Sequence, residues 1–420
     1  MQNAWVIASG TELALGQTVD TNSAWLAAQL AALGIRTLRH VTVPDDDATL
    51  RAVVLQAADA CDVILVTGGL GPTADDLSRQ ALANAAGVSL QLHAPSVEHL
   101  RAFFAARGRE MPPANTVQAM IPASATVLPN TCGTAPGFCL ALRGKPCYVL
   151  PGVPFEMRAM FERSVAPELR RAANGAVLLS RHLHTFGVGE SDLGQRICDL
   201  MARGRNPEVG TTAGFGVVGI RINAAALTRV AAEALLDETE RKVRHRLGEL
   251  VFGRDGDTLA SVVGVQLVSA GRTLATAESC TGGLLGALLT EVAGSSRYYR
   301  GGAIAYANDA KTNVLGVPCA EIEQHGAVSA AVAQTLARNV ARAFGADYAL
   351  SVTGIAGPAG GSPQKPVGLV FIGMHAPEET MSHECRFGSD APRESIRLRA
   401  ARTALNLLRL RLCRSPAPPA

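Results

Sequence analysis

Short apolar runs alternate with helical runs in two long zones of the chain, residues 1–170 and 255–413. In the first zone the strand candidates are 5–8 and 62–67, and the helix candidates are 21–33 and 77–86. The expected cap of the helix at 21–33 is Asn22 or Ser23. Such alternation is typical of parallel strands joined by helices that cover both faces of one sheet. The predicted fold class is therefore α/β, with a three-layer αβα domain at the N-terminal end and a second α/β domain at the C-terminal end.

The stretch between these zones has a different pattern. Its strand candidates are 182–186 and 217–222, and its helix candidates are 191–203 and 229–247, which indicates a small α+β module. The last residues are rich in Pro and Ala and are predicted to be disordered. The predicted organisation is a domain at 1–172, a module at 173–253, a domain at 254–414 and a tail at 415–420.

Charge and cysteine content exclude several classes of protein. The 420 residues include 39 Lys and Arg and 36 Asp and Glu, and the densest basic stretch, 241–246, follows acidic residues, as in a salt-bridged helix face. Nine cysteines without a Cys-x-x-Cys pair favour reduced thiols over disulfides or zinc. No apolar run reaches membrane-spanning length. We therefore expect a cytoplasmic protein that binds neither nucleic acid nor membranes, and we expect a homodimer.

The stretch Ala275-Thr-Ala-Glu-Ser-Cys-Thr-Gly-Gly283 predicts a reactive turn between a strand and a helix. An apolar strand candidate leads into Ser279, and the two glycines at its end open a helical run. A hydroxyl at such a turn lies beside the free N–H groups of the helix start, which suits a nucleophile next to an oxyanion hole. The alternative is a tight turn in which Ser279 or Thr281 caps the helix.

Three later segments also follow strand candidates. The strand candidates are 302–306, 348–353 and 368–374, and the third segment lies in the helix beyond the last of them. The three segments are a polar turn with Tyr306, Asn308 and Lys311, a glycine-rich loop at 353–361, and a helix start with Arg393 and Arg397. Ligands of open α/β sheets sit at the carboxyl ends of the strands, so we expect these segments to meet Ser279 at one edge.

Lys311 is the candidate base for Ser279, because His325 fits a helix-entry loop better than a catalytic position. A Ser–Lys dyad requires that burial or a neighbouring cation lower the lysine pKa from about 10.4 toward neutrality. The alternative is a solvated surface lysine. Cys280 is a rival nucleophile, since a helix start favours its thiolate, but its position predicts that it points away from the pocket.

The N-terminal zone contains a candidate phosphate site of its own. The turn Gly68-Gly-Leu-Gly-Pro-Thr73 follows a buried strand candidate and precedes a helix, so its backbone N–H groups suit a phosphate. The N–H groups concerned are those of Gly68, Gly69, Gly71 and Thr73. Asp75 and Asp76, directly behind the turn, either hold a divalent cation or cap the next helix, and the pattern leaves both open.

Six motifs of the C-terminal zone resemble, in order, those of the PncC domain, the bacterial nicotinamide-nucleotide amidase. They are Ala277-Glu-Ser-Cys-Thr-Gly-Gly283, Gly294-Ser-Ser296, Tyr306-x-Asn308-x-x-Lys311, His325-Gly-Ala-Val-Ser329, Thr353-Gly-Ile-Ala-Gly-Pro358 and Lys365-Pro-Val-Gly368. The resemblance implies hydrolysis of nicotinamide mononucleotide to nicotinate mononucleotide and ammonia, without a cofactor. By motif, Ser279 is the nucleophile and Lys311 the base, with Tyr306 beside them. Further substrate contacts are implied for Thr281, Gly282, Gly283, Asn308, Thr353, Gly354, Gly357 and Arg397.

The N-terminal signals resemble the molybdopterin-binding (MoaB/MogA-like) domain in its CinA version, and the middle zone corresponds to that family's KH-like module. The chain as a whole therefore resembles the CinA family. The resemblance implies small nucleotide substrates, Gly133 and Thr134 as further phosphate-binding residues, and ADP-ribose pyrophosphatase activity with a divalent metal at Asp75 and Asp76. Two alternatives stay open: a nucleotide- or pterin-binding scaffold, and a partner of DNA-processing proteins.

Overall fold

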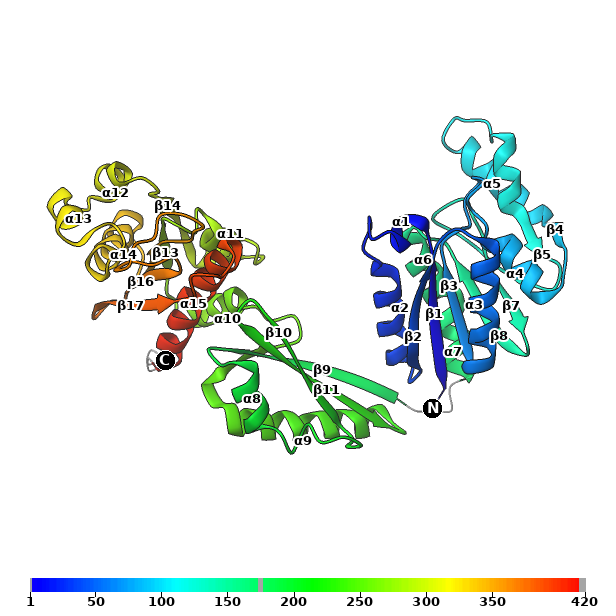
Figure 1. Cartoon of the computed structure of the whole chain (residues 1–420), viewed down its shortest axis with the longest axis horizontal. Helices are drawn as coiled ribbons and strands as arrows, with labels where there is room; N and C mark the ends of the chain where they lie inside the picture. The colour runs from blue at the N-terminus through cyan, green and yellow to red at the C-terminus, as the bar shows by residue number, and fades with distance from the viewer. Residues whose placement is uncertain (1, 173–176, 415–420) are drawn as a thin grey trace. The chain divides into compact units, whose positions relative to one another are not determined.

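The structure, a computed structural model, describes residues 2–172 and 177–414. The chain divides into two compact units (Figure 1). One unit comprises residues 1–180 and 223–236, and the other comprises residues 181–222 and 237–420.

The first unit is built on a six-stranded sheet whose order is β2-β1-β3-β8-β7-β6. The first four strands in this order are parallel, and β7 and β6 continue the sheet in antiparallel fashion. The chain leaves β1 toward β2 and later returns on the other side to β3, which makes the carboxyl ends of β1 and β3 a topological switch point. The strands are β1 Asn3–Ser9, β2 Arg36–Val43, β3 Val63–Thr67, β6 Thr126–Leu128, β7 Gly137–Leu142 and β8 Lys145–Leu150.

Helices cover both faces of this sheet, as successive residues of β1 demonstrate. Trp5 and Ile7 pack with α3 and α4 in one apolar cluster, whereas Ala4 and Val6 pack with α2, α6 and α7 in another. Since strand residues alternate between faces, β1 is buried on both sides and a three-layer domain results. The remaining elements are α1 Thr11–Ala14, α2 Thr21–Ala32, α3 Asp47–Ala60, α4 Ser78–Ala86, β4 Leu90–Leu92, α5 Ala94–Ala105, η1 Pro113–Ala119, β5 Met120–Pro122, α6 Pro154–Met160, η2 Phe161–Val165 and α7 Ala166–Ala172.

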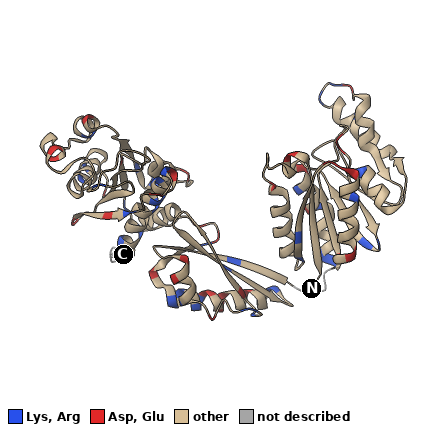
Figure 2. Ribbon diagram, viewed as in Figure 1, with Lys and Arg blue, Asp and Glu red and all other residues tan. Residues whose placement is uncertain are grey.

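The middle of the chain forms a four-stranded sheet in the order β10-β11-β9-β12 with two helices. Its elements are β9 Val177–Phe186, α8 Glu190–Arg196, β10 Glu208–Gly214, β11 Val217–Ala226, α9 Arg229–Leu247, η3 Gly248–Leu250 and β12 Val251–Arg254. Lys and Arg are interspersed with Asp and Glu along α9 (Figure 2). Ion pairs one helical turn apart join Lys242 to Glu238 (2.6 Å) and Arg244 to Glu240 (2.6 Å), which confirms the predicted salt-bridged face.

The C-terminal domain has a five-stranded sheet in the order β14-β13-β15-β16-β17. β13 is parallel to both of its neighbours, and β16 and β17 are antiparallel. Leu274 of β13 packs with α10 and α15 on one face, and Ala275 and Ala277 pack with α14 on the other. The elements are α10 Leu259–Ser269, β13 Leu274–Glu278, α11 Leu284–Thr290, η4 Ser295–Arg297, β14 Tyr299–Ile304, α12 Asn308–Leu315, α13 Cys319–His325, α14 Ala330–Phe344, β15 Tyr348–Gly354, β16 Leu369–His375, β17 Thr380–Arg386 and α15 Arg393–Arg414.

The predicted α/β fold class is confirmed by these sheets, but the predicted cap of α2 is wrong. The cap is Asp20, whose carboxylate accepts the Ser23 N–H (2.9 Å), and not Asn22 or Ser23. Asp20 directly precedes the first helical residue, and from there its carboxylate reaches the N–H of the third helical residue, which is the usual capping geometry.

The predicted helix at 191–203 is too long. Helix α8 ends at Arg196, and beyond it the chain tightens into shorter turns, as in the bond from the Leu200 N–H to the Ile197 carbonyl (2.9 Å). The tail at 415–420, predicted to be disordered, lies outside the described residues. Among the helices of residues 2–172 and 177–414, none combines the length and apolar character needed to cross a membrane.

Candidate active site

The turn after β13 places Ser279 at the carboxyl edge of the C-terminal sheet. The Ser279 N–H donates to the Val352 carbonyl of β15 (2.9 Å), and the Glu278 carbonyl accepts the Ala305 N–H just beyond β14 (2.8 Å). The three parallel strand ends therefore meet around Ser279, one strand spacing of about 4.8 Å apart. The segments expected to converge on this edge do so at the level of the backbone.

Two glycines shape the turn behind Ser279. Gly282 has φ 59° and Gly283 has φ 91°, a conformation that side chains other than glycine rarely adopt. The Gly282 N–H already donates to the Ser279 carbonyl (3.1 Å). In the described part of the chain the N–H groups of Cys280, Thr281 and Gly283 have no protein acceptor, which makes them the candidate oxyanion donors.

Glu278 organises this turn and was not predicted as a site residue. Its buried carboxylate accepts the N–H groups of Leu285 (3.0 Å) and Gly286 (2.7 Å) in the first turn of α11. A carboxylate at a helix N-terminus satisfies donors that the helix itself leaves unpaired. The signal in the sequence was a single charged residue closing an otherwise apolar strand.

Lys311, in α12, is buried beneath the polar turn that follows β14. Only 2% of its surface is exposed, and its Nζ donates to the Tyr306 carbonyl (2.9 Å). Burial lowers the pKa of Lys311, because an ammonium group with little solvent is poorly stabilised. The surface-lysine alternative is thus excluded by its burial, and the amine has the environment that a lysine base requires.

Cys280 points into the core and not toward the site. It is 5% exposed and belongs to the apolar cluster beneath α10 and α15. Burial raises the pKa of its thiol to about 11, although the charges of Arg393 and Arg397 act in the opposite direction. The thiol is therefore protonated at neutral pH, which makes it a poor nucleophile.

Two arginines of α15 join the loops of the site. Arg393 donates through Nη1 to the Gly357 carbonyl (2.6 Å) and through Nη2 to the Tyr306 hydroxyl (3.1 Å). Arg397 donates through Nη2 to the Thr281 carbonyl (2.6 Å). Of the two, only Arg397 was predicted as a site residue, because the sequence does not show which arginine of a helical turn faces which loop.

Buried polar atoms without partners mark the contact between Arg397 and Thr281. The Thr281 hydroxyl and the Arg397 Nε are both buried and form no hydrogen bond within the described residues. Unpaired buried polar groups are rare and costly. A substrate that supplied an acceptor and a donor here would satisfy both.

The other predicted site residues have different placements. Asn308 is exposed at the start of α12, and Thr353 is buried and donates its hydroxyl to the Ala327 carbonyl (2.8 Å).

A Cβ on Gly354 would lie 2.6 Å from Val370, so this glycine is needed for packing of β15 on β16. Gly357 has φ 73° and presents its carbonyl to Arg393.

His325 is the last residue of α13. Its side chain is exposed, and its ring forms no hydrogen bond within the described residues. Its backbone carbonyl accepts the Lys365 ammonium (2.6 Å), which also binds the Val328 carbonyl (2.8 Å). Ser329 then caps α14. The two motifs around His325 and Lys365 therefore hold a loop in place.

At the N-terminal switch point, the ends of two strands and the start of α2 come together. The Asn22 side chain donates to the Gly152 carbonyl (2.7 Å) and to the Thr67 hydroxyl (3.3 Å). The Thr67 hydroxyl in turn donates to the Pro151 carbonyl (2.9 Å). The ends of β3 and β8 and the start of α2 thus line one edge, where a ligand of an open sheet is expected.

The glycine-rich turn behind β3 binds groups of its own domain. The Asp76 carboxylate accepts the N–H groups of Gly71 (2.7 Å) and Thr73 (2.9 Å), and the Gly68 N–H donates to the Leu150 carbonyl (3.1 Å). Of the N–H groups predicted to hold phosphate, that of Gly69 has no protein acceptor in the described residues. Asp76 does not cap α4, whose cap residue makes no side-chain bond.

Arg79 lies buried under the same turn and was missed by the sequence analysis. Its guanidinium donates to the carbonyls of Leu70 and Gly71 (both 2.6 Å), and burial lowers its pKa to about 10. Its partners are backbone carbonyls, which carry no sequence signal.

Gly133 and Thr134 occupy a second turn of this domain. The Asn130 side chain accepts the Gly133 N–H (2.8 Å) and donates to Glu156 (2.6 Å). A Cβ on Gly133 would overlap the Glu156 carboxylate, and the Thr134 hydroxyl accepts from Gln118 (3.1 Å). A side chain at position 133 would therefore have to displace the Glu156 carboxylate.

The carboxylates of the N-terminal domain do not form a ready metal site. Among residues 2–172 and 177–414, no group of three or more His, Cys, Asp and Glu side chains is placed to hold a metal ion. Asp75 is exposed, and a hydrogen bond from Thr73 lowers its pKa. Both oxygens of Asp76 are used by the turn in front of it. The residues as arranged do not fit a resident divalent cation.

The fold and the site define a multidomain α/β protein with a serine and a buried lysine at the carboxyl edge of its C-terminal sheet. Family models match three stretches: the probable molybdopterin binding domain at 5–171, the damage-inducible protein CinA KH domain at 180–253, and the CinA C-terminal domain at 256–412. The chain belongs to the CinA family.

Relatives of similar length match nearly the whole chain. The CinA-like proteins of Synechococcus sp. (strain CC9311) and Gloeobacter violaceus (strain ATCC 29082 / PCC 7421) are each 44% identical over 409 residues, which cover 97% of this chain and 96% of each relative. A crystal structure of the competence/damage inducible protein CihA from Agrobacterium tumefaciens is 43% identical, covers 37% of this chain and 94% of that chain, and has a TM-score of 0.36.

Proposed function

We propose that the C-terminal domain is an amidase that hydrolyses nicotinamide mononucleotide to nicotinate mononucleotide and ammonia. The observation that carries the proposal is Lys311, a buried amine with a lowered pKa beside the turn that holds Ser279. A serine needs such a base to attack an amide, and a lysine serves as base only in its neutral form. The substrate is taken from the family resemblance of the motifs around these residues.

The proposed reaction proceeds through an acyl-enzyme. Neutral Lys311 takes the proton of the Ser279 hydroxyl as the oxygen attacks the carboxamide carbon. The N–H groups of Thr281 and Gly283 stabilise the oxyanion, and the Lys311 ammonium returns its proton to the leaving ammonia. Water, deprotonated by Lys311, then releases the carboxylate product and restores Ser279.

Arg397 and the loop from Gly354 to Gly357 are the proposed binding groups for the substrate phosphate. Arg397 retains donors beyond its bond to the Thr281 carbonyl, including a buried and unpartnered Nε. Guanidinium groups bind phosphate through paired hydrogen bonds. No metal or cofactor takes part in the proposed steps.

The test is ammonia release from nicotinamide mononucleotide by the purified full chain without added metal. Wild-type protein should form ammonia and nicotinate mononucleotide in equal amounts, and Ser279→Ala should not. Ser269→Ala, an exposed serine at the end of α10, is the matched control and should keep the wild-type rate. Activity that survives in Ser279→Ala would reject the serine as nucleophile, and no activity in wild type would reject the amidase.

For the N-terminal domain we propose binding of a nucleotide or pterin phosphate at the edge formed by β1, β3 and β8. The match to a probable molybdopterin binding domain and the Asn22 contacts at this edge favour a binding function. Metal-dependent ADP-ribose pyrophosphatase activity is the competing proposal, and it requires the turn to release Asp76. Incubation with ADP-ribose and Mg²⁺ separates the two: Mg²⁺-dependent cleavage that is lost in Asp76→Ala identifies an enzyme, and binding without cleavage identifies a scaffold.

A further inference from the structure

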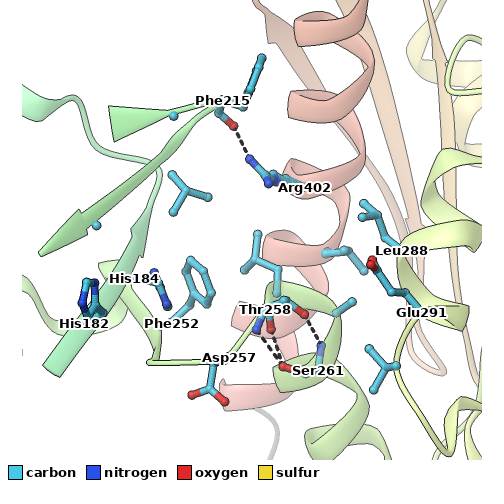
Figure 3. Close-up of a pocket in the computed structure, with 18 of the residues that line it drawn as sticks. His182, His184, Phe215, Phe252, Asp257, Thr258, Ser261, Leu288, Glu291 and Arg402 are labelled. Atoms are coloured by element: carbon cyan, nitrogen blue, oxygen red, sulfur yellow. Dashed lines mark hydrogen bonds between the residues drawn. The ribbon is translucent and has the colours of Figure 1, made fainter. Parts of the chain in front are cut away.

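The second unit contains a cavity of about 780 Å³ whose lining includes none of the predicted site residues. Its walls come from strands of the middle sheet and from α10, α11 and α15 (Figure 3). Leu288 and Glu291 line it at the C-terminal end of α11, whereas Ser279 precedes the opposite end of that helix. The cavity is therefore separate from the candidate active site.

One wall of the cavity is aromatic. The rings of Phe252 and His184 are stacked, with centroids 5.8 Å apart and an angle of 23° between their planes. The His184 ring is held in place, because its Nε2 lies 2.7 Å from the Asp255 carbonyl oxygen. Two stacked rings leave only their outer faces, and a planar ligand ring can extend the stack on such a face.

Arg402 supplies a cation to the same cavity. Its Nη1 donates to the Phe215 carbonyl (3.0 Å), and burial lowers its pKa. In the described residues this is its one hydrogen bond, and it forms no salt bridge. A guanidinium group has five N–H donors, so Arg402 has donors left for an anion, and phosphate matches their paired geometry.

Two carboxylates also line the cavity, and they differ in availability. Asp257 accepts the Arg254 N–H (2.8 Å) and belongs to a turn, whereas Glu291 is exposed and forms no ion pair in the described residues. A carboxylate only accepts hydrogen bonds, which suits the amino group of a heteroaromatic base. The hydroxyls of Thr258 and Ser261 bond to each other's backbone in a capping box and add little.

We propose that this cavity binds a heteroaromatic phosphomonoester of the size of a mononucleotide. The ring stacks on the outer face of the Phe252–His184 pair, the phosphate pairs with Arg402, and an amino group of the ring donates to Glu291. The volume lies within the range of about 300–1,000 Å³ that is usual for small-molecule sites. An aromatic ligand without phosphate would leave the remaining donors of Arg402 unpaired. An aliphatic phosphate would leave the aromatic wall uncovered.

The test is binding of AMP and CMP to the full chain by isothermal titration calorimetry, with adenosine and ribose 5-phosphate as partial ligands. Arg402→Gln, Phe252→Leu and Glu291→Gln should each lower the affinity of the nucleotide for this cavity. For Arg402→Gln we expect a loss of about tenfold or more, because a charge-assisted hydrogen bond is lost. Adenosine and ribose 5-phosphate should each bind about tenfold more weakly than AMP or worse. Arg386→Gln, an exposed arginine of β17, is the charge-matched control and should bind as wild type.

Nucleotide bound elsewhere in the chain persists in all of these variants and is counted separately by stoichiometry. Identical affinity and stoichiometry in wild type, Arg402→Gln and Phe252→Leu would overturn the proposal, as would the absence of AMP and CMP binding. Adenosine that binds as tightly as AMP would overturn the role of Arg402. Because Arg402 also holds the Phe215 carbonyl, melting temperatures are measured in parallel, and Glu291→Gln, an exposed substitution, decides if Arg402→Gln fails to fold.

Discussion

Replacing Lys311 by methionine separates the catalytic role of this side chain from its role in packing. Methionine has a similar length and fills the same buried space, but it cannot accept a proton. Loss of a general base lowers turnover by about 100-fold to 10,000-fold. At about 1.36 kcal/mol per factor of ten, this corresponds to roughly 3–5 kcal/mol of lost transition-state stabilisation.

The same substitution should not destabilise the fold. Each unit by which burial lowers the pKa of Lys311 corresponds to about 1.4 kcal/mol against its charged form. Below that lowered pKa the wild type carries the full cost of the buried ammonium. Its stability then rises with pH until about pH 10.4, because over this window the unfolded state binds more protons than the folded state. The methionine variant lacks this cost.

The assay combines ammonia release from nicotinamide mononucleotide with thermal unfolding at several pH values. Wild-type turnover should rise as the pH passes upward through the lowered pKa of Lys311, because only the neutral amine is a base. Lys145→Met, which removes a half-exposed lysine paired with Asp62 (3.1 Å), is the control and should change neither activity nor its pH dependence. Turnover of Lys311→Met within a few-fold of wild type would refute the reasoning, and so would a melting temperature at pH 7 well below that of wild type.

Three further substitutions test the surroundings of the site. Cys280→Ala should keep amidase turnover within a few-fold of wild type and lower the unfolding free energy by roughly 1 kcal/mol, because it removes a buried thiol that is protonated at neutral pH; turnover and denaturant unfolding measure the two effects. Glu278→Gln should lower the unfolding free energy by about 1–3 kcal/mol, since an amide cannot accept both N–H groups of the α11 start; denaturant unfolding at pH 7 measures it. Arg393→Met should raise KM or lower kcat by about tenfold, because the Gly357 loop and Tyr306 lose the guanidinium that joins them, and steady-state kinetics measures it.

Each of these results has an outcome that contradicts its reasoning. Loss of activity in Cys280→Ala would make the thiol the nucleophile. Wild-type stability in Glu278→Gln would show that the start of α11 is held by other contacts. Unchanged kinetics in Arg393→Met would show that its bonds to the two loops are incidental, and Arg386→Met is the exposed control for loss of an arginine.

Local features of the sequence were sufficient to predict the α/β fold class and the position of Ser279. Alternating apolar and helical runs specify strands and helices, and glycines after a strand specify a turn, since both depend on neighbours in the chain. Because parallel strands of an open α/β sheet have their carboxyl ends at one edge, the meeting of the segments that follow them was predictable. Lys311 could be named as the candidate base, but its burial could not be predicted.

What the tertiary structure decided depends on contacts between residues distant in sequence. Packing placed the Cys280 thiol in the core, and it brought Arg397 to the Thr281 carbonyl, 116 residues earlier in the chain. It also brought Arg402 and Phe252 to one cavity from segments 150 residues apart in the numbering. Burial lowers or raises a pKa through the absence of solvent, and solvent is excluded by the whole fold and not by the neighbouring residues in the chain.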